Sequence, residues 1–394
     1  MARPVLSRRW AFVAVAYAFA AGMFGTTLPT PLYPLYQREY GFGELVVTVV
    51  FAAYAVGVLV ALVLAGGASD VVGRRRVLFT GLAFSAVSAV VFLTSGGLPA
   101  LFMGRVLSGL SAGLLTGTAT ATLLDLAAPT DRGRASLVAT LANMGGLGCG
   151  PLASGVLSTA FGAPRRVPFA VDLIIVAVAF AAVWAVPEPV PRHGRSRWST
   201  TRLALPAELR GAFVPAAVAG FAGFVVLGVF TSVGPAALGQ LLSVTNRVAV
   251  GAVVFAVFAA SAAGQVALER LDPVRALPVG CVVLALGMGV LIAGLQAPSL
   301  ALLVFGGVVG GFGQGLSFRA GMAGLNAVTP PAHRGEVTSL FFVVLYVGIS
   351  LPVVAVGLGA QAFGLLTAGT VGAAVVALLA LVAFAILQRS RGSG

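Results

Sequence analysis

The 394-residue sequence contains no lysine, and charged residues of any kind make up only 9% of it. A soluble domain carries about 25% charged residues, so little of the chain can be a soluble domain. Because the phosphate-binding loop of many ATP-hydrolysing proteins requires a lysine, the chain cannot hydrolyse ATP through that motif. Its two His, His193 and His333, fall in predicted loops, and Cys149 and Cys281 fall in apolar segments. We expect both cysteines to pack as small apolar side chains, and we predict neither a disulfide nor a metal site.

Apolar residues and glycine dominate what is present. Hydrophobic residues make up 59% of the chain, the mean hydropathy is +1.04, and 52 residues are glycine. Small residues let membrane helices approach closely, so we predict an all-α integral membrane protein that packs as a helix bundle. Twelve apolar segments of spanning length occur, at 10–29, 45–66, 77–95, 99–124, 135–160, 167–187, 211–233, 247–268, 276–295, 299–328, 336–360 and 362–387.

Arginine supplies the whole positive charge, 24 residues in all, and its distribution predicts the orientation of the chain. If the N-terminus is cytoplasmic, eighteen arginines lie at the cytoplasmic ends of the segments and four at the opposite ends. Cytoplasmic loops are enriched in basic residues, so both termini are predicted to be cytoplasmic. The same bias explains the net charge of +13 without a nucleic-acid partner.

The sequence divides near its midpoint. The polar stretch 188–210 is rich in Arg and Pro, and we interpret it as a cytoplasmic linker between two six-helix halves, 1–187 and 211–394. Residues 129–133 read Pro-Thr-Asp-Arg-Gly, and residues 331–335, which lie 202 positions later, read Pro-Ala-His-Arg-Gly. A proline follows each motif within the next segment, and the same offset carries Asp70 onto Asp272. Three coincidences at one offset indicate a duplicated six-helix unit.

The polar segment 66–76, between the second and third apolar segments, has the features of a hinge or latch. Its pattern is a glycine, an aspartate four positions later, and then a glycine with two basic residues. These positions are filled here by Gly66, Asp70, Gly73, Arg74 and Arg75. This resembles the loop between the second and third helices of major facilitator superfamily transporters, although Val71 replaces the basic residue usually found after the aspartate. The resemblance implies two pseudo-symmetric six-helix bundles around a central cavity, worked by alternating access. It also implies that Asp70, Arg74 and Asp125 form a charge relay that latches one state. The alternative is charge that only sets topology.

The fourth apolar segment carries an arginine inside the bilayer. Arg105 shares one helix face with Ser108, Gly109, Ala112 and Thr116, a small polar stripe suited to lining a cavity. With Arg105, Gly109 and Gly113 in place, it also resembles the fourth-helix motif of the same family, where the arginine is tied to proton coupling. The alternative is an arginine held in a structural hydrogen-bond network.

The fifth segment contains a glycine-rich run that includes Gly146, Gly150, Pro151 and Gly155. Proline removes one helical hydrogen bond, and glycines permit bending and close contact. The run resembles the fifth-helix signature of major facilitator antiporters, with Ser154 replacing its penultimate glycine. The alternative is ordinary glycine-rich packing.

Three further polar residues and one proline-rich segment stand out. We expect Asp172 to pair with a nearby arginine, Arg165 or Arg166, or to serve as a helix-start charge, more than to carry a proton. Arg319 would contact an anionic group or reach the inner interface, and Asn143 would bond between helices. The prolines in 28–36 predict a non-helical turn or gate.

The predicted function is secondary transport without a cofactor. We expect export of a small, hydrophobic compound by proton antiport, by a monomer in a bacterial cytoplasmic membrane, with the lipid bilayer as its surroundings. Uptake of a sugar or metabolite is the alternative within the family. A membrane enzyme or a non-transporting receptor is the alternative outside it, although the five aspartates are scattered rather than paired.

Overall fold

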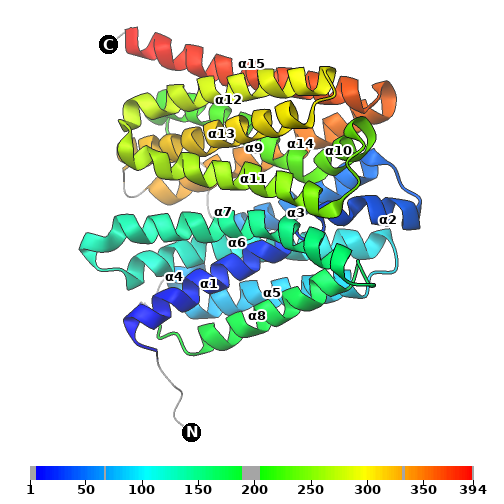
Figure 1. The fold of residues 1–394 in the computed structure, drawn as a ribbon. Helices are drawn as coiled ribbons and strands as arrows, with labels where there is room; N and C mark the ends of the chain where they lie inside the picture. The colour runs from blue at the N-terminus through cyan, green and yellow to red at the C-terminus, as the bar shows by residue number, and fades with distance from the viewer. Residues whose placement is uncertain (1–5, 66–67, 189–204, 331–332, 393–394) are drawn as a thin grey trace. The chain divides into compact units, whose positions relative to one another are not determined.

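A computed structural model describes residues 6–65, 68–188, 205–330 and 333–392, and the described chain is built of helices (Figure 1). Contacts divide the chain into two compact units: residues 1–32 with 53–202, and residues 33–52 with 203–394. Most of the predicted linker, 189–204, lies outside the described residues. The grouping of 33–52 with the second unit has no signal in the sequence.

The first unit is built around its N-terminal helix. α1 (Arg8–Thr27) contacts the four other long helices that lie wholly in the unit. The helices that belong entirely to this unit are α1, α4 (Ala68–Val72), α5 (Arg74–Leu93), α6 (Leu98–Leu126), α7 (Arg132–Ala160) and α8 (Val167–Trp184). α3 (Glu44–Ala65) contributes its second half to this unit and its first half to the other.

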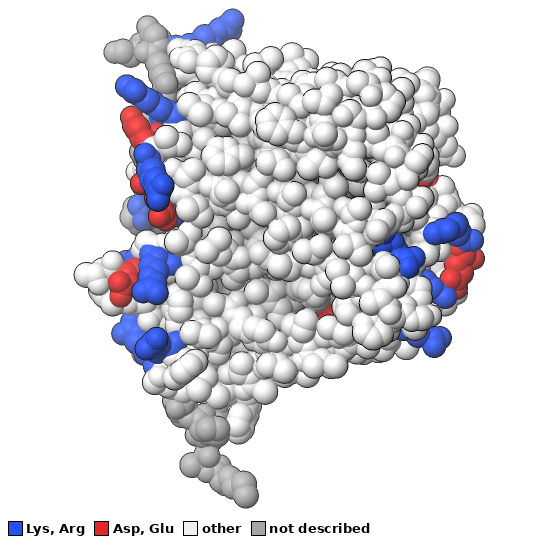
Figure 2. Space-filling model, viewed as in Figure 1, with Lys and Arg blue, Asp and Glu red and all other residues white. Residues whose placement is uncertain are grey.

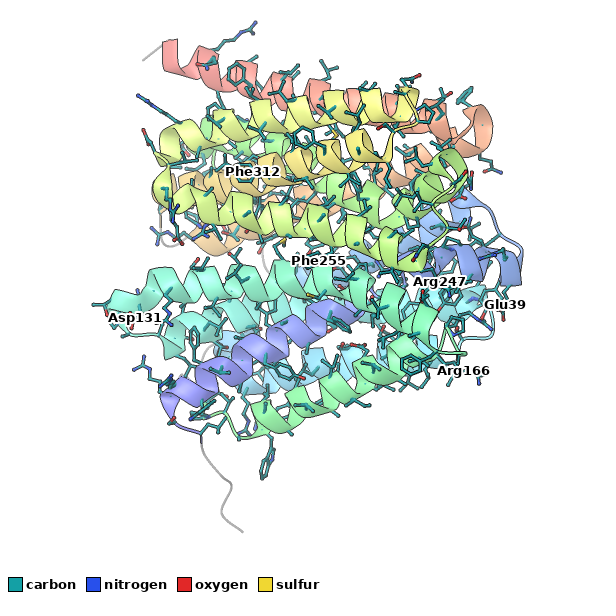
Figure 3. All side chains as sticks on the ribbon, in the orientation of Figure 1. Glu39, Asp131, Arg166, Arg247, Phe255 and Phe312 are labelled. Carbon is teal, nitrogen blue, oxygen red and sulfur yellow. The ribbon has the colours of Figure 1, made fainter. Side chains whose placement is uncertain are left out.

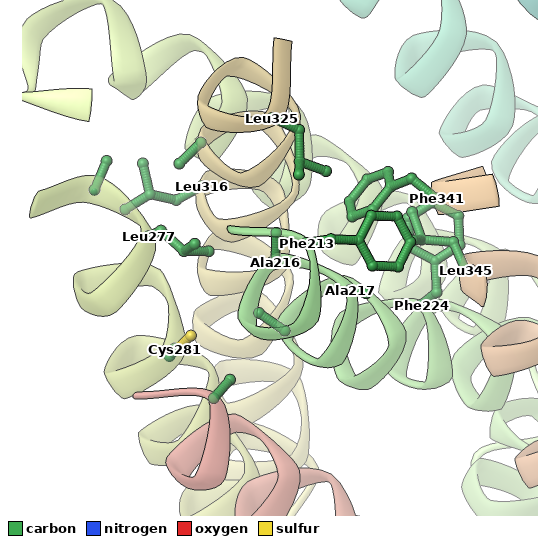
Figure 4. Packing of buried hydrophobic residues seen from close by; sticks show 14 of the residues in the cluster. Phe213, Ala216, Ala217, Phe224, Leu277, Cys281, Leu316, Leu325, Phe341 and Leu345 are labelled. Atoms are coloured by element: carbon green, nitrogen blue, oxygen red, sulfur yellow. The ribbon is translucent and has the colours of Figure 1, made fainter. Parts of the chain in front are cut away.

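The second unit repeats this arrangement with its own central helices. Its helices are α2 (Tyr33–Tyr40), α9 (Arg210–Ser232), α10 (Gly234–Leu242), α11 (Arg247–Ala267), α12 (Pro273–Gln296), α13 (Leu300–Val328), α14 (Arg334–Phe363) and α15 (Leu365–Gly392). Phe213 of α9 and Phe341 of α14 meet edge to face in its core, with ring centroids 6.3 Å apart (Figure 4). Buried Cys281 of α12 belongs to the same cluster.

The helix bounds extend the internal repeat beyond the sequence motifs. α9, α13 and α14 begin 202 residues after α1, α6 and α7 respectively, and α6 and α13 have the same length of 29 residues. Both α7 and α14 contain an internal proline, Pro151 and Pro352. The two halves therefore share a helix pattern as well as short motifs.

Eleven helical segments in the described chain are long and apolar enough to cross a membrane. α7 is not among them although it has 29 residues, because its glycines and polar residues lower its hydropathy. With α7 there are twelve long helices, and the predicted all-α membrane fold is confirmed. On the face seen in Figure 2, charged side chains gather at the helix ends and the surface between them is largely apolar.

Two local predictions are corrected. The segment after α1 is helical rather than an extended turn: a 3-10 turn at Thr30–Leu32 leads into α2. Pro34 is the second residue of α2, where its missing N–H is not needed, so the proline does not prevent a helix. Cys149 is exposed on α7 rather than packed inside, whereas Cys281 is buried as expected.

Candidate functional site

The hairpin between α3 and α5 contains the short helix α4 and a glycine in a left-handed conformation. Gly73 has φ +105°, a value that strains any residue with a side chain, and a Cβ there would lie 2.8 Å from Glu188 Oε2. Gly66 lies outside the residues that the structure describes. Asp70 lies in α4, but the structure does not describe its side chain. The predicted partnership of Asp70 therefore stays a prediction.

Arg74 is the centre of the polar contacts at this hairpin. Its Nε lies 3.1 Å from Asp125 Oδ2 at the end of α6, and its Nη1 donates to Ser69 Oγ at 2.5 Å. The side chain of Arg74 is 13% exposed and that of Asp125 is 32% exposed. Two residues that the sequence proposed for one relay, 51 positions apart, are thus in direct contact.

Glu188 is a member of this cluster that the sequence did not reveal. Its Oε1 accepts from the backbone N–H of Arg74 at 2.8 Å, and its Oε2 accepts from that of Arg75 at 3.3 Å. The first N–H groups of a helix have no acceptor within the helix, and a carboxylate at a helix N-terminus is favoured electrostatically. Nothing in the sequence distinguishes this acid, which follows the sixth apolar segment, from a loop charge. The guanidinium of Arg75 lies over the ring of Phe79, 5.9 Å from its centroid.

Arg8 completes the cluster from α1. Its Nε donates to the carbonyl of Leu126 at 2.7 Å, and its Nη2 donates to the carbonyls of Asp125 and Ala127 at 3.1 and 3.0 Å. These carbonyls end α6 without helical partners, and a cation is favoured there. Arg8, Arg74, Asp125 and Glu188, which we name the hairpin cluster, therefore connect the ends of α1, α5, α6 and α8.

Arg105 lies in the interior of the first unit and is only 2% exposed. Its Nη1 donates to the carbonyl of Thr26 in α1 at 2.5 Å, and its guanidinium lies 4.7 Å from the ring centroid of Tyr54 in α3. The cation therefore has both a charge-assisted hydrogen bond and an aromatic face. Ser108, also buried, donates to the carbonyl of Arg105 within α6 at 2.9 Å. Thr116, three turns further on, is half-buried.

The glycine-rich run of α7 packs directly against α1. A Cβ on Gly146 would lie 2.5 Å from the carbonyl oxygen of Ala20, and one on Gly150 would lie 2.5 Å from that of Phe24. Gly155, also buried, accepts through its carbonyl from the hydroxyl of Thr159 at 2.8 Å. Glycine is thus required at 146 and 150 because two backbones meet there.

Pro151 explains one further contact between these helices. Because proline has no N–H, the carbonyl of Leu147 four residues earlier loses its helical donor. Thr27 of α1 replaces that donor, since its Oγ1 donates to the Leu147 carbonyl at 2.8 Å. The hydrogen bond that Pro151 leaves unmade in α7 is therefore replaced at the crossing with α1.

Arg319 in the second unit contacts α11 and the 3-10 turn Leu268–Arg270 that follows it. Its Nη1 donates to the carbonyl of Gln265 at 3.1 Å, and its Nη2 lies 3.5 Å from Glu269 Oε1. A buried amide, that of Gln314, accepts from the hydroxyl of Ser261 at 2.6 Å between the same two helices. The anionic partner of Arg319 in the structure is therefore a residue of the chain itself.

Asp172 of α8 corrects the expectation of a local ion pair. It is 2% exposed, its Oδ1 has no hydrogen-bond partner among the described residues, and neither Arg165 nor Arg166 is paired with it. Arg166 lies at the end of the unit where α8 begins, and Asp131 marks the opposite end (Figure 3). Asp172 points into the unit instead, where a Cβ on Gly25 of α1 would lie 2.7 Å from its Oδ2.

Comparisons with known proteins agree on a single family. The family model described as Major Facilitator Superfamily matches residues 11–292. MdtD of Salmonella dublin, a protein named for multidrug resistance, is 26% identical over 149 residues, which cover 38% of this chain and 32% of MdtD. A triacylglyceride transporter of Mycolicibacterium smegmatis is 34% identical over 116 residues, which cover 29% of this chain and 19% of that protein. The chain thus matches a third or less of the length of these relatives.

Solved structures match over the whole chain at low identity and so show the fold alone. The human organic anion transporter MFSD10 has a TM-score of 0.71 at 18% identity, with 97% of this chain and 100% of that chain covered. A peptide transporter, POT, has a TM-score of 0.77 at 14% identity, with 98% and 96% covered. A bacterial homologue of the lysosomal transporter Spinster has a TM-score of 0.72 at 17% identity, with 96% of each chain covered.

Proposed function

The chain belongs to the Major Facilitator Superfamily and is a multi-pass membrane transporter, and we propose that it exports a small, largely apolar compound in exchange for protons. The observation that carries export is the crossing of α1 and α7. There Gly146 and Gly150 of the antiporter-like run pack against the α1 backbone. Thr27 supplies the hydrogen bond that Pro151 cannot donate within α7. Relatives named for multidrug resistance and for triacylglyceride transport support a transport function, and we propose the apolar substrate by analogy with the second of them.

Proton coupling is supported by Arg105, the buried cation of the first unit. Arg105 matches the family arginine tied to coupling, and it lies in the interior on a carbonyl of α1. A guanidinium does not release its proton in proteins, so Arg105 would hold a substrate or act on an acid that does. We further propose a monomer in a bacterial cytoplasmic membrane, with both termini cytoplasmic.

The purified protein in liposomes tests this function. With Hoechst 33342, a lipophilic dye, as the probe, we expect ATP-independent dye movement that becomes uphill when a pH gradient is imposed. A protonophore should abolish the uphill component. Uphill movement that survives the protonophore and requires sodium would replace the proton with another ion, and absence of any flux above that of protein-free liposomes would contradict export of this class of compound.

The hairpin cluster is proposed to latch one conformation of the transporter. Glu188→Gln removes the charge at the start of α5, and Asp70→Asn removes the proposed family partner without changing volume. Each substitution should slow transport, because a charge interaction of about 1 kcal/mol shifts a balanced two-state equilibrium several-fold. Dye flux is measured with protein amounts in the membrane matched.

Glu208→Gln is the matched control for this prediction. Glu208 is an exposed acid in the 3-10 turn before α9, and the same chemical change there should leave the flux unchanged. Wild-type flux in both Glu188→Gln and Asp70→Asn would show that these charges set topology and do not latch a state.

A further inference from the structure

Asp172 is a deeply buried acid that the contacts of the fold do not use. It is 2% exposed, and Oδ1 has no hydrogen-bond donor among the described residues. An ionised carboxylate without partners is very costly in an apolar environment, whereas the neutral acid costs far less. An ionisable residue kept within a transmembrane segment at this cost is by default a candidate for function.

Asp172 and Arg105 face consecutive residues of α1. The carboxylate faces Gly25 of α1, and the guanidinium binds the carbonyl of the next residue, Thr26. Phe169, one turn before Asp172, stacks on Phe92 of α5 with centroids 4.9 Å apart. The same Phe92 ring lies against Gly104, the residue before Arg105. A Cβ on Gly104 would lie 2.7 Å from this ring. The acid and the cation therefore border one region, beside an aromatic layer.

The other ionisable groups on the helices around α8 are distant or uncharged. α8 packs on α1, α5 and α7. Their ionisable residues are Arg8, Arg9, Tyr17, Arg74, Arg75, Arg76, Arg132, Arg134 and Cys149. Tyr17 donates its hydroxyl to the carbonyl of Ile175 at 3.1 Å. Arg9 is sixteen residues from Gly25, about 24 Å along the helix, and the arginines of α5 and α7 lie in the first turns of those helices. Arg166, just before α8, is six residues from Asp172, about 9 Å.

We propose that Asp172 carries the exchanged proton, an inference that rests on the proposed proton antiport and identifies the acid it requires. The proton binds Oδ1 and neutralises the carboxylate within the bundle, and it leaves from the same oxygen when the site opens to water on the other side. Arg105 is the cation that stabilises the ionised form. Gly25 leaves the space that the carboxyl group occupies.

The isosteric variant Asp172→Asn tests this assignment in liposomes with Hoechst 33342 as the probe. Uphill, pH-driven dye export should fall to the rate of protein-free liposomes, while dye exchange at equal concentrations on both sides should persist. Asp131→Asn, the same change at an exposed acid, should keep both activities. Wild-type uphill export by Asp172→Asn would overturn the proposal.

Infrared spectroscopy separates this proposal from the proposed function. Wild-type protein near neutral pH should show a carboxylic C=O band that Asp172→Asn lacks and Asp131→Asn retains, whatever the transport result. If wild-type protein shows no pH-driven export but this band is present and assigned to Asp172, proton antiport of the dye fails and the buried protonated acid stands. An identical band in Asp172→Asn would overturn the assignment.

A second variant keeps the test decisive if Asp172→Asn does not fold. Gly25→Ala places a methyl group 2.7 Å from Oδ2 and leaves the acid in place, so the carboxylic band should shift and uphill export should slow. An unchanged band together with unchanged export in Gly25→Ala would overturn the proposal.

Discussion

Gly150→Leu is expected to abolish transport, because its side chain would begin 2.5 Å from the carbonyl oxygen of Phe24 and against the hydroxyl of Thr27. Backbone atoms of α1 cannot move aside as a flexible side chain can, so α1 and α7 would separate. Forcing even small groups into a packed interior costs about 1–3 kcal/mol, and leucine adds four carbons here. Leu152→Ala, on a half-buried side chain of the same helix, should retain most of the transport activity. The measurements are dye flux in liposomes and thermal unfolding in detergent.

Neighbouring glycines of α7 provide a matched control for this prediction. A Cβ on Gly146 would lie 2.5 Å from the carbonyl oxygen of Ala20, whereas one on Gly145 would have no neighbour within 4 Å. Gly146→Ala should therefore destabilise the protein, while Gly145→Ala should be neutral or stabilise it by up to about 1 kcal/mol through helix propensity. Equal melting temperatures for these two alanine variants would contradict a close backbone contact at Gly146. The glycine-rich run would then be ordinary helix packing.

Arg105→Ala should eliminate uphill export and also destabilise the first unit. The substitution leaves the buried carbonyl of Thr26 without its donor and removes the cation from the ring of Tyr54. Loss of a charge-assisted hydrogen bond of this kind costs about 1.5–3 kcal/mol. Arg105→Lys should recover only part of the activity, because lysine lacks the planar fork that can bind a carbonyl and stack on an aromatic ring together.

Arg9→Ala is the control for the loss of an arginine. Arg9 is exposed in the first turn of α1, so its removal should leave pH-driven dye export and the melting temperature unchanged. Uphill export by Arg105→Ala at the wild-type rate would remove Arg105 from the coupling mechanism and leave it a structural role.

Features that depend on neighbours along the chain could be predicted from the sequence. The apolar segments marked in the sequence located the long helices within a few residues. They included α7, although its glycines lower its mean hydropathy. The hairpin pattern identified Arg74 and, through the family resemblance, its contact with Asp125. Spacing along one helix and a motif in one loop carry the first kind of information, whereas the contact between Arg74 and Asp125, 51 positions apart, came only from the family resemblance. The latch role of these residues stays a prediction.

Contacts between distant segments that no family motif covers could not be predicted. Glu188 binds N–H groups more than a hundred residues earlier in the chain, and an isolated acid after an apolar segment looks like a loop charge. Asp172 was expected to pair with arginines close in sequence, yet the fold turns its side chain toward Gly25. Only the arrangement of α1, α6 and α8 shows that Asp172 and Arg105 face consecutive residues of α1, Gly25 and Thr26.

The bond between Thr27 and the Leu147 carbonyl limits how the first unit can deform. A proline usually leaves its helix a spare acceptor and a place to flex, but here a second helix occupies that acceptor. Bending α7 at Pro151 would break the hydrogen bond that Thr27 of α1 donates, and the glycine contacts along the crossing would open with it. α1 and α7 therefore behave as a single composite rod. A conformational change in this unit must therefore move α1 and α7 together. The flexible positions are then the segments that join these two helices to their neighbours.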